Sequence, residues 1–185
     1  MAEEITYEQF GVNFVTKVVT AERVAATIGR VSGSEVSAGP MAAGPGGAAS
    51  VTASGRIGTI GAKVSFRREQ LGFDATIPIA LVLDVRVAGA NHRYNGKVTV
   101  SLRLGVRAVA PLSLMIDVDE VRPEHVEVSL EADGVRARFL QRLGGIDDEV
   151  RRTVASIVGE RLGSPEAREV RELHILDFVD KAWNA

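Results

Sequence analysis

The chain has 185 residues, of which 45% are hydrophobic and 25% are charged, and its formal net charge is −2. This composition is typical of a globular protein with a core, and it argues against disordered and membrane-embedded classes. The small negative charge and an aromatic content of 5% provide neither a basic surface nor a base-stacking platform, so nucleic acid is not an expected partner. The absence of cysteine excludes disulfides, thiol nucleophiles and cysteine-ligated metals.

The start of the chain and its hydropathy bear on where the protein resides. Residues 1–4 form an acidic rather than a basic start, and no run of about 18 apolar residues occurs. We therefore expect a cytoplasmic protein without a transmembrane segment. Arginine outnumbers lysine, and alanine, glycine and valine are abundant, which indicates a GC-rich bacterial genome.

Residues 6–31 carry apolar side chains at steps of three and four, which predicts an amphipathic helix. Thr20 is an equally good N-cap for a second helix after a break. Residues 32–50 lack periodicity and contain several glycines and prolines, so we expect a loop there, with or without short extended pieces. The apolar positions of the helical region are Tyr7, Phe10, Phe14, Val18, Ala21, Val24 and Ile28.

Two long runs of alternating apolar residues, 73–87 and 92–106, predict one antiparallel hairpin. Each strand has about 15 residues, roughly three times the common length. Folding the chain about Gly89-Ala90 places both apolar rows on one face, and Pro78 is then expected beside an edge or a bulge because it cannot donate a ladder hydrogen bond. The expected pairs are Val87–His92, Val85–Tyr94, Leu81–Val98, Ile79–Val100, Ile77–Leu102 and Phe73–Val106.

Shorter strands are expected on either side of the hairpin. Residues 51–57 and 64–66 alternate weakly before it. After the hairpin, residues 112–118 and 126–130 alternate and predict a third ribbon, in which the two segments face each other across a polar turn. The predicted sheet spans residues 51–132.

The segment after Asp133-Gly134 is compatible with two structures. Asp-Gly favours a type I′ hairpin, in which residues 135–139 pair back on the preceding strand. Apolar steps of three and four continue further and predict one long helix over residues 135–162, which is the alternative we favour. The tail, residues 165–185, is expected to add a last strand and a closing helical turn. Side chains of the long helix expected on the inner face of the sheet are Phe139, Val150 and Val154.

The sequence contains no recognisable catalytic or metal-binding motif. Its three histidines, His92, His125 and His174, are too far apart in sequence for one helix or strand to join them. No serine lies in the Gly-x-Ser-x-Gly pattern of a nucleophile elbow, and the Gly/Pro segment lacks a phosphate-loop pattern. The acidic segment 117–120 lacks the further ligands of a calcium loop. We expect no catalytic residue, no metal site and no cofactor.

The long strands 73–87 and 92–106, the strand 126–130 and the amphipathic run after them form a pattern that resembles the tubular lipid-binding superfamily. The likeness covers roughly residues 47–162 and rests on the order of the elements. It implies an α+β fold in which a long-stranded, strongly curved antiparallel sheet wraps around a long C-terminal helix, here with an added N-terminal amphipathic helix. A helix-grip fold is the nearest alternative. The amphipathic run passes through Phe139, Val150, Val154 and Ile157.

A long curved sheet around one helix often leaves an unfilled apolar interior. We therefore predict that residues 1–185 form a single domain that binds or carries a lipid or another apolar molecule without catalysis. A fully packed structural or protein-interaction domain is the alternative, and an enzyme with acid–base groups at His92 and Tyr94 is a third hypothesis. The predicted ligand-binding residues are Ile77, Ile79, Leu81, Leu83, Tyr94, Val98, Val100, Leu102 and Phe139.

Overall fold

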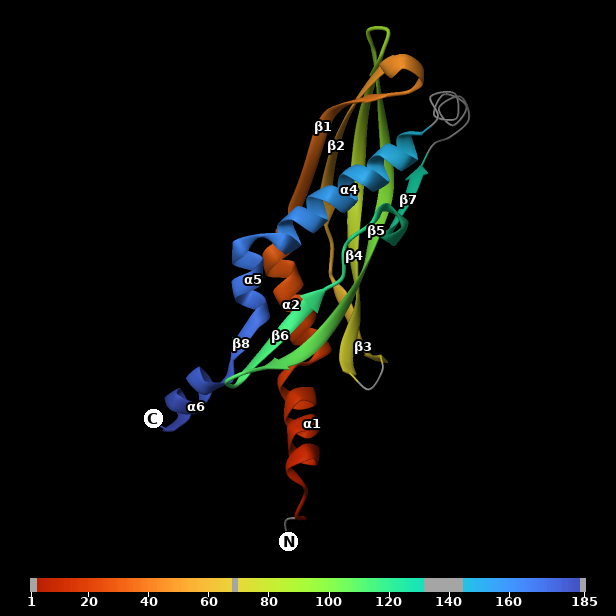
Figure 1. Ribbon diagram of the computed structural model, residues 1–185. Coiled ribbons are helices and arrows are strands. Elements are labelled where there is room, and N and C mark those ends of the chain that lie inside the picture. The colour runs from red at the N-terminus through yellow and green to blue at the C-terminus, as the bar shows by residue number, and fades with distance from the viewer. Residues whose placement is uncertain (1–2, 68–69, 132–144, 184–185) are drawn as a thin grey trace.

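The computed structural model describes residues 3–67, 70–131 and 145–183. Within these ranges the protein is an α+β structure, built on a strongly curled antiparallel sheet of eight strands. Helices lie along one side of the sheet, and the molecule is elongated along its central strands (Figure 1). The prediction of an α+β fold with a curled antiparallel sheet is confirmed.

Strands β4 (Gln70–Val87) and β5 (Ala90–Val109) form the central hairpin. Ala88 and Gly89 connect them with φ angles of 48° and 80°, the positive values that a two-residue type I′ turn requires. Buried side chains alternate with more exposed ones along both strands, as the period of two predicts. Central pairs of the ladder are Leu83–Tyr94, Leu81–Gly96, Ile79–Val98 and Ile77–Val100.

The predicted register of the hairpin is wrong by two residues, although both apolar rows lie on one face as expected. Ile79 pairs with Val98 rather than with Val100. A shift of two residues leaves every side chain on its own face, so the alternation alone does not fix the register. The turn fixes the register instead. A positive φ angle at Ala88 is uncommon for a residue with a Cβ atom, so the sequence does not indicate where this turn lies.

Two shorter strands follow one another along the outer edge of β4. These are β2 (Ala49–Ile57) and β3 (Gly61–Arg67), which end and begin on either side of Pro78. At this interruption the carbonyl of Pro78 accepts a hydrogen bond from the backbone N–H of Gly58 at 2.8 Å. The expectation that Pro78 lies beside an edge or a bulge is confirmed.

The other edge of β5 is also covered by two strands in series. β6 (Ser113–Val118) pairs with residues 104–109 of β5, and β7 (Val126–Glu131) pairs with residues 95–100. The predicted ribbon of these two segments against each other is therefore wrong. The reason is the length of β5, whose 20 residues offer enough backbone for both strands.

The sheet continues at its margins with β1 (Glu35–Ala43), which pairs with β2, and β8 (Glu172–His174), which pairs with β6. The prediction of a loop over residues 32–50 is wrong for β1. Its register is interrupted between Ala38 and Met41, and such an interruption at a sheet edge tolerates glycine and proline. These residues obscure the strand in the sequence.

Two helices take the place of the predicted helix over residues 6–31. Thr20 caps the second one by accepting a hydrogen bond from the backbone N–H of Arg23 at 3.4 Å, so the expected alternative of a restart at Thr20 is confirmed. In the tail, the predicted strand is limited to β8, and a closing helix follows as expected. The helical elements are α1 (Tyr7–Val18), α2 (Ala21–Ser32), η1 (Pro45–Gly47), η2 (Pro123–His125), α4 (Ile146–Gly163), α5 (Pro165–Arg171) and α6 (Ile175–Trp183).

Helices α2 and α4 pack on the same side of the sheet and share one hydrophobic core with the alternating residues of the hairpin (Figure 1). Val150 and Val154 of α4 are buried in this core, as predicted. The 18 residues of α4 extend over about 27 Å, whereas β5 extends over about 66 Å. α4 therefore covers less than half of the sheet's length, and α2 covers the part beneath it.

The predicted long helix over residues 135–162 is present from Ile146 onward. Residues 135–144, including Phe139, lie outside the described residues. The wrapping of the sheet around one long C-terminal helix is not confirmed by α4 and stays a prediction.

Gly55 in β2 provides a test of the packing between sheet neighbours. A Cβ atom at Gly55 would lie 2.7 Å from Cγ2 of Ile79 and 3.0 Å from Cγ2 of Val36, which is too close without displacement of both. We expect Gly55→Ala to lower the free energy of unfolding by about 1–3 kcal/mol, as measured by urea denaturation. Gly61→Ala in β3 is the control, because a Cβ atom there meets nothing within 4 Å. Equal losses in the two variants would contradict this packing.

Candidate functional site

The predicted ligand-binding residues form the centre of the core. Those that the structure describes are all buried, and none of them lines either of the two large apolar grooves at the lower end of the molecule. Phe139 lies outside the described residues. A ligand-binding role for this set stays a prediction. The buried members are Ile77, Ile79, Leu81, Leu83, Tyr94, Val98, Val100 and Leu102.

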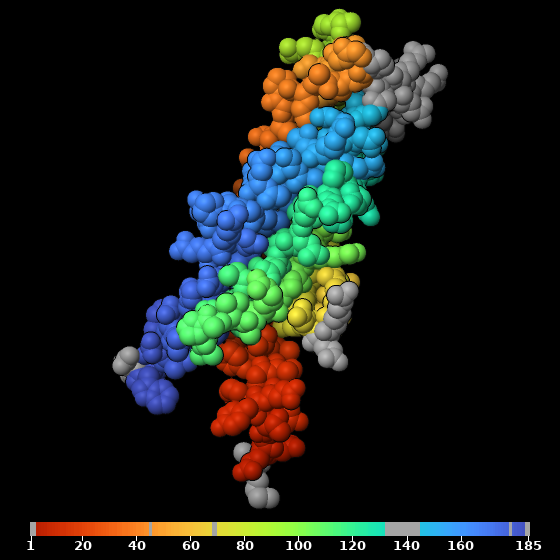
Figure 2. All heavy atoms as spheres, viewed as in Figure 1, coloured from red at the N-terminus to blue at the C-terminus, as the bar shows by residue number. Residues whose placement is uncertain are grey.

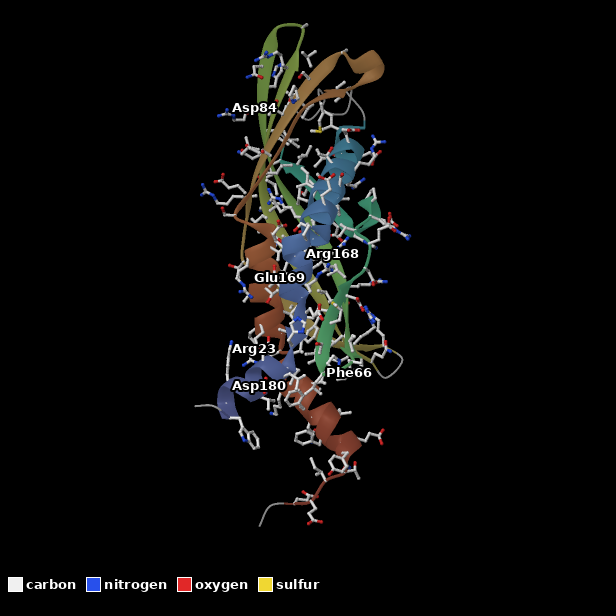
Figure 3. The ribbon with its side chains drawn as sticks, turned by 60° about the vertical axis from the view of Figure 1, so that its left-hand side comes forward. Arg23, Phe66, Asp84, Arg168, Glu169 and Asp180 are labelled. Carbon is white, nitrogen blue, oxygen red and sulfur yellow. The ribbon has the colours of Figure 1, made fainter. Side chains whose placement is uncertain are left out.

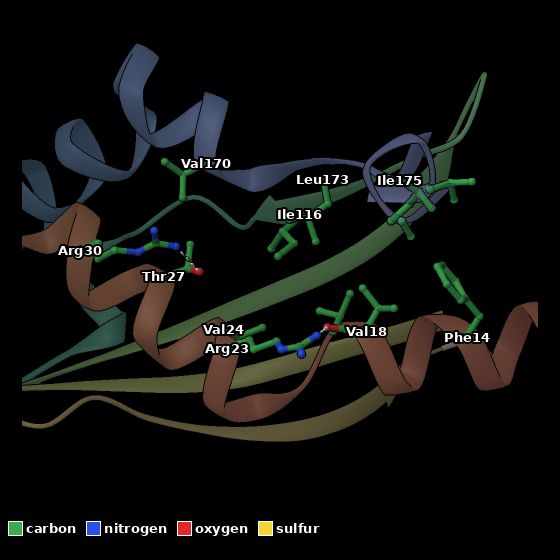
Figure 4. Close-up of a pocket in the computed structure, with 13 residues that line it drawn as sticks. Phe14, Val18, Arg23, Val24, Thr27, Arg30, Ile116, Val170, Leu173 and Ile175 are labelled. Carbon is green, nitrogen blue, oxygen red and sulfur yellow. Dashed lines mark hydrogen bonds between the residues drawn. The ribbon is translucent and has the colours of Figure 1, made fainter. Parts of the chain in front are cut away.

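The larger of these grooves lies at the end of the molecule where both chain termini are found (Figures 1 and 4). Its volume is about 610 Å³. Side chains from α1, α2, β6, α5, β8 and α6 surround it, so that segments far apart in the sequence meet there. We call it the basal groove. Its main apolar lining residues are Phe14, Val18, Val24, Ile116, Leu173, Ile175 and Val179.

The wall of the basal groove that α2 forms carries polar side chains beside Val24, and the opposite wall is apolar. Arg23, Thr27 and Arg30 follow one another along α2, and Val170 and Leu173 face them from α5 and β8 (Figure 4). Steps of four and three residues place the three polar side chains on one stripe of the helix. The groove therefore has the two-sided character of a site for an amphipathic molecule.

A second groove of about 600 Å³ lies beside the first, between α1 and the turn that joins β5 to β6. We call it the side groove. Phe10 and Val15 of α1 contribute to its lining, together with residues 108–114. The two grooves share Phe14, Ile175 and Val179. Their apolar surfaces are thus continuous around α1 and α6.

Helix α1 projects from the body of the molecule (Figure 2). Several of its large apolar side chains are exposed to solvent. None of its residues is buried. Tyr7 is 97% exposed and Phe10 is 58% exposed, while Trp183 at the end of α6 is 86% exposed. Exposed apolar side chains gathered in one region mark a binding surface more often than scattered ones do.

The two arginines of the basal groove are held only by neutral partners. Arg23 Nη1 donates to the carbonyl of Val18 at 2.8 Å, and Arg30 Nη2 donates to Thr27 Oγ1 at 3.3 Å. Neither guanidinium forms an ion pair with any residue that the structure describes. Asp180 of α6 lies on the same lower part of the molecule (Figure 3), but it does not line the groove. The polar wall therefore carries two positive charges.

Arg171 of α5 brings a further positive charge to one end of the basal groove. It lines a small adjoining cavity of about 20 Å³ together with Thr27 and Ile116, which also line the groove. Burial lowers the pKa of Arg171, the charge of Arg168 lowers it further, and Asp117 partly offsets both effects. Because an arginine stays protonated at neutral pH, the end of the groove between α2 and α5 is electropositive.

Ser113, His174 and Glu172 form a cluster between β6 and β8 whose composition is that of a hydrolase triad. Ser113 Oγ lies 3.1 Å from His174 Nδ1, and Glu172 Oε1 lies 3.7 Å from the same nitrogen. A triad requires the serine and the carboxylate at opposite nitrogens of the ring. Ser113 and His174 are also direct partners in the strand ladder, so strand pairing explains the contact.

His92 and Tyr94, the acid–base pair of the enzyme hypothesis, lie near the tip of the hairpin, opposite Val85 and Leu83. Tyr94 is buried and His92 is half-buried. Neither lines the basal groove or the side groove, so neither is placed to act on a molecule bound there. Within the described ranges, no group of three or more His, Asp or Glu side chains is arranged to hold a metal ion.

Comparison with known proteins adds no identification of the chain. No family model matches it, and no curated protein matches it either. The resemblance to tubular lipid-binding proteins stays a prediction. Of the helices in the part of the chain that the structure describes, none is both long and apolar enough to cross a membrane.

The basal groove is not predicted by the sequence patterns, because its walls come from six elements that are separated along the chain. One signal for it is visible in the sequence. Arg23, Thr27 and Arg30 recur at helical spacing beside the apolar stripe of Val24 and Ile28. Spacing of this kind identifies a polar stripe, but the strand and helices opposite it are known only from the fold.

Arg171→Met tests whether this half-buried cation opposes folding. Methionine keeps a long apolar side chain and removes the charge, at the expense of a hydrogen bond from Nε to the carbonyl of Ala167 at 3.1 Å. We expect the free energy of unfolding, measured in urea, to stay the same or rise by up to about 1 kcal/mol. Arg56→Met, at an exposed position of β2, is the control. A loss above about 1 kcal/mol would mean that the charge of Arg171 is well compensated.

Proposed function

We propose that the protein binds a lipid or another apolar small molecule in the basal groove, without catalysis. The observation that carries this proposal is the groove itself, about 610 Å³ in volume and lined mainly by aliphatic side chains. Sites for small molecules are commonly about 300–1,000 Å³, mostly apolar, with a few polar groups that orient the ligand. The basal groove has each of these properties.

The side groove supports the same function. It adds about 600 Å³ of apolar space, and it meets the basal groove at Phe14, Ile175 and Val179. An aliphatic chain bound in one groove therefore has a continuous apolar path into the other. This arrangement favours a long, flexible ligand over a compact one.

The predicted site between the sheet and one long helix is a separate proposal. A ligand there would contact core residues such as Leu81 and Val100, whereas a ligand in the basal groove would contact neither. Substitutions at the two places therefore distinguish the two sites.

Binding of a protein partner is the second candidate function, and the exposed apolar side chains of α1 favour it. Tyr7 and Val12 lie outside both grooves and are 97% and 58% exposed. Large apolar and aromatic side chains of this kind are typical anchors of protein interfaces. A partner that binds α1 would bury side chains that are exposed to solvent in this structure.

Val179→Asp in α6 tests the proposed ligand site. Val179 lines both grooves and is 42% exposed, so the substitution introduces a charge into the apolar space without emptying the core. The probe is N-phenyl-1-naphthylamine, a neutral dye whose fluorescence rises in apolar sites. We expect saturable binding to the wild-type protein and a Kd at least about tenfold higher in the variant, because a bound apolar molecule would desolvate the new carboxylate.

Leu176→Asp is the matched control, since Leu176 lies on the same helix, is also 42% exposed and lines neither groove. Its Kd for the dye should equal that of the wild-type protein. The proposal fails if the wild-type protein shows no saturable binding, or if the two substitutions weaken binding equally.

A further inference from the structure

The basal groove carries a charge pattern that defines the class of its ligand. We infer that it binds an anionic amphiphile, a molecule with an aliphatic chain whose carboxylate or phosphate head lies beside Arg30 and Thr27 of α2. This inference rests on the proposed function of the basal groove, and it adds the charge and the orientation of the ligand.

Helix α2 brings both polar and apolar side chains to the wall of the groove. Arg23, Thr27 and Arg30 line it (Figure 4). Val24, which also lines the groove, and Ile28 are buried in the core. The facing side chains from α5, β8 and α6 are aliphatic. A molecule bound between these walls meets cations on one side and hydrocarbon on the other, which suits a ligand with one charged end.

Arg30 and Thr27 present hydrogen-bond donors at the same place. Arg30 Nη2 donates to Thr27 Oγ1 at 3.3 Å, which uses one of the five N–H donors of the guanidinium. Thr27 accepts this bond, and its own hydroxyl proton is engaged in no hydrogen bond within the described part of the chain. An anionic oxygen beside the pair would accept hydrogen bonds from both, and bonds to a charged acceptor are the stronger class.

Carboxylates balance the positive charge at this end only in part. No Asp or Glu is among the described residues that line the basal groove. Arg171 lines the adjoining small cavity together with Thr27. The carboxylate that partly restores its pKa, Asp117, also accepts a hydrogen bond from Arg107 Nη2 at 2.9 Å. A bound anionic head would supply the missing negative charge.

The two ends of the polar stripe differ, which sets the direction of the ligand. Arg23 lies about 10 Å from Arg30 along the helix axis, and its guanidinium is held by the carbonyl of Val18 at the end of α1. Phe14 and Val179 make this end of the groove apolar. The aliphatic chain therefore points toward α1 and α6, and the head lies at the end formed by α2 and α5.

Three ligands with the same chain test the inference by displacement of N-phenyl-1-naphthylamine at neutral pH. Dodecanoate and dodecyl phosphate carry an anionic head, and 1-dodecanol carries a neutral one. We expect each anionic ligand to bind the wild-type protein about 10- to 100-fold more tightly than 1-dodecanol, the range for hydrogen bonds to a charged group. Arg30→Gln should remove most of this advantage and change the affinity for 1-dodecanol much less.

Arg23→Gln is the matched control, because it removes the same charge from the same wall two helical turns away. It should keep the preference for the anionic ligands. Arg23 and Arg30 are both exposed, so neither variant should unfold, which circular dichroism and urea denaturation check. Thr27→Val, which removes the hydroxyl donor and keeps the shape, should weaken the anionic ligands alone.

The outcomes separate this inference from the proposed function. Equal affinity of the wild-type protein for all three ligands would overturn the anionic class while leaving apolar binding intact. Loss of the preference in Arg23→Gln but not in Arg30→Gln would overturn the placement of the head. Absence of any saturable dye binding by the wild-type protein would instead mean that the basal groove is not a ligand site at all.

Discussion

The length of the β4–β5 hairpin is the constraint on which the rest of the fold depends. Its ladder runs from the Gly72–Gly105 pair to the Val87–Ala90 pair, and every flanking strand is much shorter. Each edge of the hairpin therefore carries two strands in series, β2 and β3 along β4, and β7 and β6 along β5. The sheet consequently has two halves that the hairpin joins. Each half can be closed by different helices.

The two halves differ in how completely their inner face is covered. α2 and α4 fill the space over the centre of the hairpin, where the apolar side chains of the inner face are buried. At the base, α1 contributes no buried residue and β8 has only three residues. Phe14 is the one aromatic side chain among the described residues that line the basal groove, and the other apolar side chains among them are aliphatic. Protein interiors are normally close-packed. The unfilled apolar space at the base is therefore the observation on which the proposed ligand site rests.

Patterns with a short period predict local structure well, and contacts between distant segments poorly. Alternation of two predicts the buried face of the hairpin, because each side chain's face depends only on its parity. It does not predict the register, which depends on the unusual backbone of Ala88. It also does not predict that β6 and β7 both pair with β5, since either partner satisfies their alternation. The basal groove is even harder to predict from the local periodicity of the sequence. Arg23 of α2 and Leu173 of β8 line it from opposite sides, and only the folded sheet brings these two elements together.

The two candidate functions use different side chains of the same helix. Phe14 lines both grooves, whereas Phe10 lines the side groove and not the basal groove. The two rings stack with 6.2 Å between their centroids. Tyr7 and Val12 lie outside both grooves. Tyr7 lies on the same stripe of α1 as Phe14, two helical turns away, so a partner that binds Tyr7 would adjoin a ligand that packs on Phe14. Both would then contact the same helix, and any change that one causes in the affinity of the other is reciprocal.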